Sequence, residues 1–106
     1  MRSFSDKSLI EGVAISLCAD YFRRKKCIAE RTVGKRVRME YSYINAKVLD
    51  AAAGIVGTAL AEIFIWEIGR CIGFARSEVN TMSELTYKTK KAKIKEEILR
   101  NIYYID

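Results

Sequence analysis

The stretch from Val48 to Ala75 constrains the fold more than any other part of the chain, because it is long, apolar and free of proline. It is rich in Ala, Leu, Ile and Glu and far longer than an ordinary β-strand, so it predicts an α-helix that continues to about Glu78. Its few charged residues fall on different sides of a helical wheel. A helix that is apolar on most sides is either buried in a protein core or embedded in a membrane.

The position of the charges decides between these two environments. The uncharged part runs only from Ala51 to Ala61, which is short of the roughly 20 residues needed to cross a bilayer. An extension to that length would place Glu62, Glu67 and Arg70 at membrane depth. The sequence therefore predicts a buried helix in a soluble protein and no transmembrane segment, with a spanning helix as the alternative. Glu67 and Arg70 are three residues apart and predict a local ion pair.

Small residues recur at every fourth position of this helix, a spacing that allows a second helix to approach closely. The helix-packing residues predicted here, with the only tryptophan of the chain, are Ala53, Gly54, Gly57, Ala61 and Trp66. The alternative is that Gly54 and Gly57 break the segment into two helices, since glycine weakens a helix interior. Gly69 and Gly73 mark a second break near the far end.

The residues before this stretch predict an amphipathic helix, capped by Ser5 and continuing to about Glu30. Its core-facing side carries Ile10, Ala14, Leu17, Tyr21 and Ile28. We expect Gly34 to terminate this helix as its C-terminal cap.

Residues 33–44 are ambiguous. Apolar and polar residues alternate from Arg36 to Tyr43, which is the period of a strand, yet Val37, Tyr41 and Ile44 also follow a helical spacing. We expect an irregular or extended connector that leads into helix by Asn45. A continuous helix and a strand that pairs between two chains are the alternatives.

The final segment predicts a helix that ends at about Tyr104. Either Thr81 together with Glu84, or Ser83 alone, supplies its N-terminal cap. Its first half is rich in lysine and threonine, so we expect it to be solvated, whereas the isoleucines of its second half predict docking on the core.

Basic residues are concentrated in one region. Residues 23–39 carry eight basic groups and one acidic group, a net charge of +7, in a chain whose formal net charge is +6. Such a cluster suits an acidic protein surface, a nucleic acid or anionic lipid, and a solvated surface is the alternative. The predicted partner-binding residues are Arg23, Arg24, Lys25, Lys26, Arg31, Lys35, Arg36, Arg38, Tyr41 and Tyr43.

Residue types that carry chemistry are scarce. The chain has no histidine, the commonest general base and metal ligand. Its three cysteines include no CxxC pair and are predicted to be reduced core residues, with a reactive thiol at Cys27 as the alternative. Glu62 stands alone among apolar residues, so we expect it to pair with a basic side chain from another helix, and an acid–base role is the alternative. We predict no catalytic residue, metal or cofactor, and no enzymatic activity.

These observations predict an all-α protein, residues 1–106 forming a single helical domain: a small three- or four-helix bundle around a long apolar central helix. A small chain without catalytic groups is expected to act by binding. We predict a protein-binding module of the kind that inhibits or neutralises a partner, such as an immunity protein or an antitoxin, and a partner with an acidic surface. The alternatives are a nucleic-acid-binding regulator that uses the basic cluster 23–38 and attachment to a membrane surface. A homodimer and a cytoplasmic location are further predictions.

Overall fold

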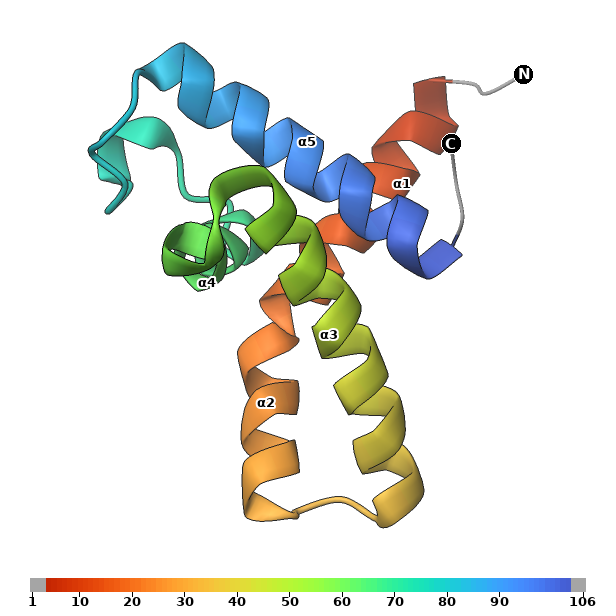
Figure 1. The fold of residues 1–106 in the computed structure, drawn as a ribbon. Helices are drawn as coiled ribbons and strands as arrows, with labels where there is room; N and C mark the ends of the chain where they lie inside the picture. Colours follow the sequence, from red (N-terminus) through yellow and green to blue (C-terminus); the bar gives the residue numbers. More distant parts are fainter. Residues whose placement is uncertain (1–3, 104–106) are drawn as a thin grey trace.

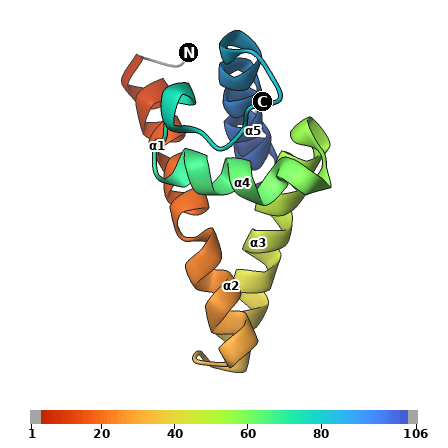
Figure 2. The same ribbon diagram turned by 90° about the vertical axis from the view of Figure 1, so that its left-hand side faces the viewer.

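The structure is a computed structural model that describes residues 4–103, with side chains described from Leu9 onward. In this range the chain forms helices and no strand, so the predicted all-α class is confirmed. In chain order the helices are α1 (Phe4–Ala19), α2 (Tyr21–Glu30), α3 (Lys35–Val56), α4 (Thr58–Gly69), the short 3-10 helix η1 (Phe74–Arg76) and α5 (Glu84–Tyr103). Helices α2 and α3 form an antiparallel hairpin that projects from a body built by α1, α4, α5 and the end of α3 (Figures 1 and 2).

The predicted first helix is divided in two. Its described part begins at Phe4, so Ser5 lies within the helix and the prediction that it is the cap was wrong. The helix is interrupted at Asp20. The hydrogen-bond pattern continues across the interruption, because the Asp20 amide donates to the Ser16 carbonyl at 3.1 Å and the Asp20 carbonyl accepts from the Arg24 amide at 2.9 Å. The end of α4 lies against this junction. A Cβ atom added at Gly69 would lie 2.6 Å from the Ala19 amide nitrogen, so only glycine allows this approach.

Helix α2 ends without glycine, and the prediction that Gly34 caps it was wrong. Arg31 occupies the left-handed position instead, with φ of 54°, and its amide donates to the Cys27 carbonyl. Gly34 has an extended conformation and precedes the first turn of α3 as its N-terminal cap. Glycine is accepted at both kinds of cap, so the residue type alone did not distinguish the end of one helix from the start of the next.

The predicted connector at residues 33–44 was also wrong, because α3 begins at Lys35. The continuous helix considered as an alternative is the observed structure. The helical spacing prevails because α2 supplies a neighbour: Val37 and Ile44 are half-buried in the hairpin, and Val48 is completely buried further along. Tertiary packing thus overrides the alternating pattern.

The predicted central helix breaks at Gly57, as the alternative reading of its glycines proposed. Gly57 has φ of 85°, a value that favours glycine, and α3 and α4 meet there at 115°. The predicted stripe of small residues therefore does not lie along one helix. Ala61 is buried, but Gly54 and Gly57 are exposed, and no described atom beyond the adjacent backbone lies within 4 Å of the Cβ position of either glycine. Glycine provides the turn here rather than a close helix contact.

The core forms where α3, α4 and α5 cross, with α1 against them. Its buried apolar side chains are Ala14, Cys18, Tyr21, Val48, Ala51, Ala52, Ala61, Phe64, Ile65, Ile68, Val79, Tyr87, Ile94, Ile98 and Leu99. Ser83 caps α5, since its hydroxyl accepts a hydrogen bond from the Thr86 amide at 3.2 Å. Of the two caps predicted for this helix, Ser83 alone is therefore the observed one. The described helix ends at Tyr103, and the predicted end at Tyr104 lies outside the described residues.

Candidate functional site

The projecting α2–α3 hairpin carries all ten residues that the sequence predicted to bind a partner (Figure 2). The structure separates these residues into a group that stabilises the fold and a group that faces outward. The difference is visible in the hydrogen bonds and ion pairs of each basic side chain.

Arg24 belongs to the fold and is removed from the candidate surface. Its side chain is only 4% exposed, its Nε donates to Asn45 Oδ1 at 2.6 Å and its terminal nitrogen donates to the Leu17 carbonyl at 2.6 Å. Asn45 in turn donates to the Tyr21 carbonyl at 3.0 Å. Burial lowers the pKa of the Arg24 guanidinium, and these acceptors compensate for the water it has lost. The group ties α1, α2 and α3 together at the base of the hairpin.

Arg23 and Arg38 are held by partners within the hairpin. Arg23 lies 3.6 Å from the Asp20 carboxylate and places its guanidinium 5.5 Å from the centre of the Tyr41 ring. Arg38 donates to the Val33 carbonyl at 2.6 Å and so closes the 31–34 turn. Both still contribute positive charge, but their geometry is fixed by the hairpin itself.

Lys25 connects the hairpin to the body of the protein. Its ammonium group lies 2.6 Å from the Glu62 carboxylate of α4, which also accepts a hydrogen bond from the Tyr21 hydroxyl at 2.8 Å. The predicted pairing of Glu62 with a basic side chain from another helix is confirmed. The hydrogen bond from Lys25 lowers the pKa of Glu62, which is the opposite of what an acid–base role in an apolar pocket requires.

The remaining four cations lie at the tip of the hairpin. The side chains of these four residues are all exposed, and none has a hydrogen-bond or ion-pair partner among residues 9–103, whose side chains are described. The four are Lys26, Arg31, Lys35 and Arg36. They come from the end of α2, the turn and the start of α3. The tip is therefore a surface whose cations form no ion pair with a carboxylate of the described side chains.

An apolar strip accompanies this charge on one side of α3. Met39 is 64% exposed and Tyr43 is 50% exposed, whereas Tyr41 is half-buried against Arg23. A shallow hollow between the two helices is lined by Ile28, Lys35, Arg38, Met39, Ser42 and Tyr43. The sequence predicted Tyr43 as a binding residue but not Met39, which lies one helical turn before it. The sequence alone did not indicate that this side of α3 faces solvent.

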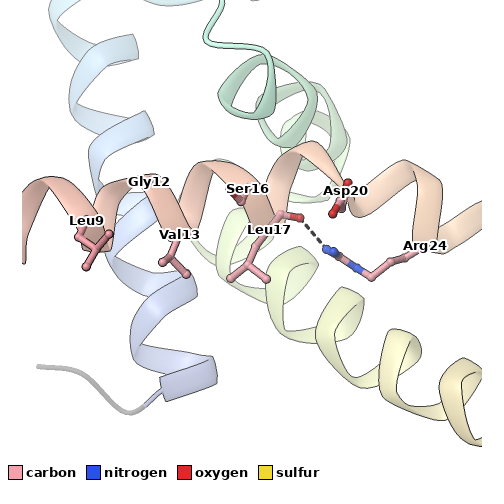
Figure 3. A pocket seen from close by; sticks show the side chains of 7 residues that line it. All are labelled: Leu9, Gly12, Val13, Ser16, Leu17, Asp20 and Arg24. Carbon is pink, nitrogen blue, oxygen red and sulfur yellow. Dashed lines mark hydrogen bonds between the residues drawn. The ribbon is translucent and has the colours of Figure 1, made fainter.

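A second hollow lies on α1, away from the hairpin tip (Figure 3). Leu9, Val13 and Leu17 form its apolar side, and Asp20 and Arg24 lie at its far end. Leu9 is 72% exposed. The Arg24 side chain is buried and already donates hydrogen bonds to Leu17 and Asn45, so it contributes to the base of the hairpin rather than to a ligand site.

Trp66, predicted as a helix-packing residue, lies on the surface of α4 with 41% exposure. Its ring contacts Phe22 of α2 edge-on, with 5.6 Å between the ring centres, and the Arg70 guanidinium stacks 3.7 Å from its centre. The predicted ion pair between Glu67 and Arg70 is therefore wrong.

Glu67 is instead buried with its own set of donors. Its carboxylate accepts hydrogen bonds from the Ser77 hydroxyl at 2.6 Å, the Tyr87 hydroxyl at 2.6 Å and the Glu78 amide at 2.8 Å. Burial, with the Glu67 carboxylate beside it, raises the pKa of Tyr87 to about 12. The network fastens the segment between α4 and α5 to the core. The Glu67 side chain is 1% exposed, and its oxygens already accept these three hydrogen bonds.

The three cysteines, predicted to be core residues, differ in burial: Cys18 is buried and Cys27 is half-buried, but Cys71 is exposed, so the prediction was wrong for Cys71. Burial raises the pKa of the Cys18 thiol to about 12, so this buried cysteine is held in its unreactive form. Residues 4–103 contain no group of three acidic, cysteine or histidine side chains placed to hold a metal ion. In the same range no single helix is both long and apolar enough to cross a membrane; α3 and α4 combine the necessary length and apolar composition only together, and they are bent by 115°.

Comparison of the chain with protein-family models, with curated proteins and with solved structures finds no match. Function must therefore be inferred from the surface of this molecule alone.

Proposed function

We propose that this protein is a non-enzymatic protein-binding module whose α2–α3 hairpin docks on an acidic surface of a partner protein, in the manner of an inhibitor, immunity protein or antitoxin. The observation that carries this proposal is the hairpin tip, where Lys26, Arg31, Lys35 and Arg36 project without acidic partners among the described residues. Positive charge concentrated on a projecting element accelerates encounter with a negative surface and selects against positive ones.

The hairpin has the mechanical properties that such a role needs. Arg24 and Asn45 lock its base, and Lys25 braces it against Glu62 of the body. Its tip is therefore presented in a fixed geometry, which lowers the entropy lost on binding. The exposed Met39 and Tyr43 add apolar area of the type that is enriched at protein interfaces.

Capture of the partner tests this proposal. The immobilised full-length protein is incubated with extract of the source cells, with and without nuclease, and retained proteins are identified and then produced in pure form for reconstitution. Three versions are compared: the wild type, a tip variant (Lys26→Gln, Lys35→Gln and Arg36→Gln) and a charge-matched control (Arg76→Gln, Lys88→Gln and Lys93→Gln). We expect a reconstituted acidic partner to bind the wild type and the control but not the tip variant.

Nucleic acid is the second candidate, favoured by the net charge of +7 over residues 23–39. Basic side chains that contact phosphates displace counterions, so the affinity of such a complex falls steeply as the salt concentration rises. If the tip contacted six or more phosphates of labelled duplex DNA or RNA, the affinity would fall roughly a thousandfold between 50 and 200 mM salt. An apolar protein interface depends much less on salt. Retention that disappears on nuclease treatment, with this steep salt dependence, would replace the protein partner with a nucleic acid.

A further inference from the structure

Four residues of α3 form a stripe on one side of the hairpin. Lys35, Met39, Tyr43 and Lys47 follow one another at intervals of four, so they lie above one another on the same side of the helix. At 1.5 Å per residue the stripe is about 18 Å long. Its two central side chains are exposed and mostly apolar, and its two ends are cationic.

The surroundings of the stripe make it concave. Ile28 of α2 contributes to the hollow beside Met39 and Tyr43, and Lys35 and Arg38 lie at its tip end. At the other end the Lys47 ammonium lies 5.4 Å from the centre of the Tyr43 ring. The Tyr43 ring therefore lies between Lys47 and the apolar side chains of Ile28 and Met39. In this position the ring can be covered by a bound partner and still keep its contact with the lysine.

We infer that this stripe receives an acidic amphipathic helix of the partner, with the partner's apolar side chains on Met39, Tyr43 and Ile28 and its carboxylates beside Lys35 and Lys47. This inference rests on the proposed function and names the part of the partner that the hairpin recognises. A helix is the natural occupant because the stripe, about 18 Å long with an apolar centre and cationic ends, matches a helix whose apolar face is flanked by carboxylates.

The combination of cationic ends with an exposed apolar centre favours this occupant over the other polyanions. Phosphate contacts can use the lysines, but they gain nothing from an exposed methionine held beside an isoleucine. An acidic helix uses both kinds of group at once, since glutamates on either side of an apolar face reach the cations while leucines cover the methionine.

Methyl NMR of the full-length protein, with 13C-methyl methionine, tests the inference directly. The chain contains Met1, Met39 and Met82, so the signal of one residue reports on the stripe. The probe is an 18-residue acetylated and amidated peptide of leucine, alanine and glutamate with its leucines on one helical face. A scrambled peptide of the same composition is the matched control. Duplex DNA and phosphatidylserine vesicles are titrated in parallel.

We expect the amphipathic peptide to shift the Met39 signal saturably and the scrambled peptide to bind at least about tenfold more weakly. Because a Met39→Ser, Tyr43→Ser variant lacks the reporter methyl group, its affinity is measured by calorimetric titration against the wild type. It should bind the amphipathic peptide about tenfold more weakly, since the substitutions remove the apolar centre of the contact. Leu85→Ser, which alters an exposed leucine on α5, should leave the affinity unchanged.

The failures are distinguishable. If both peptides bound equally, and only the tip variant weakened their binding, the inference of a helix-binding stripe would be overturned. The same result would support an acidic partner for the tip. A Met39 signal that moves with DNA or vesicles but not with the amphipathic peptide, or that stays unmoved by every probe, would overturn the inference. The capture experiment decides the proposed function independently of these results.

Discussion

Arg24 and Arg23 are neighbours in the sequence with nearly identical local composition, yet the structure gives them different roles. Arg24 is buried at the base of the hairpin and satisfies two acceptors, whereas the side chain of Arg23 is 54% exposed beside Asp20. Charge counting could not distinguish them. The distinction depends on which side of α2 faces Asn45, a residue 21 positions further along the chain.

This difference predicts unequal effects of the same substitution. Arg24→Met leaves the Asn45 and Leu17 oxygens without their donor and should lower the free energy of unfolding by about 2–4 kcal/mol. Arg23→Met removes an exposed pair and should change it by less than about 1 kcal/mol. Urea denaturation of both variants gives the comparison, and equal effects would contradict the structural role of Arg24.

Glu67 shows a second effect that only the fold reveals. Glu67→Gln replaces a carboxylate that accepts three hydrogen bonds with an amide whose NH2 group faces donors, so it should destabilise the protein by about 2–3 kcal/mol. Glu96→Gln, on the exposed side of α5, is the matched control and should be nearly neutral. Thermal unfolding by circular dichroism measures both; an unchanged Tm for Glu67→Gln would show that the carboxylate is dispensable.

At the scale of elements, the sequence predicted the existence of the helices better than their ends. The amphipathic first segment, the apolar central segment and the Ser83-capped last helix are all present. The errors at residues 33–44 and at Gly34 share a cause: the hairpin partner that makes α3 a helix from Lys35 onward is itself produced by folding. The sequence allowed two interpretations of Gly57, a close contact between helices or a helix break. Only the packing of the folded chain distinguishes them.

The two glycines of this region predict opposite effects. Gly54 lies within α3 with open space around its Cβ position, so Gly54→Ala should stabilise the protein by about 0.5–1 kcal/mol. Gly57→Ala meets no neighbour either, but it forces alanine to adopt φ of 85° and should destabilise by about 1 kcal/mol or more. Measured changes in Tm of the same sign would contradict the turn at Gly57.

For the whole molecule, stability should depend on pH mainly on the alkaline side. Burial raises the pKa of Cys18 from 9.0 and that of Tyr87 from 10.0, each to about 12. Because the folded state holds these protons more tightly than the unfolded chain, the stability they contribute is complete below pH 9 and is lost as the pH rises toward 12. The chain has no histidine to add a transition near neutral pH.

Urea unfolding between pH 7 and pH 11 checks this dependence. The free energy of unfolding should be flat to about pH 8.5 and then fall. Tyr87→Phe should make the fall above pH 10 shallower, whereas Tyr103→Phe, at an exposed tyrosine, should leave the slope as in the wild type. A Tyr87→Phe protein with an unchanged slope would show that this hydroxyl does not titrate in the transition.

The molecule as a whole divides into a body that is fixed by its core and a hairpin that presents charge. The sequence located the charge within residues 23–38 but not its division between Arg24 at the base, the braced Lys25 and the free cations at the tip. The predicted homodimer stays a prediction. Light scattering after size-exclusion chromatography would measure it directly.

The central claim is that the free cations of the tip bind the partner, and calorimetric titration of the reconstituted partner tests it most directly. The tip variant, with Lys26, Lys35 and Arg36 changed to Gln, should bind at least about tenfold more weakly than the control with Arg76, Lys88 and Lys93 changed to Gln, although both lose the same charge. Equal affinities for the two variants would contradict the account.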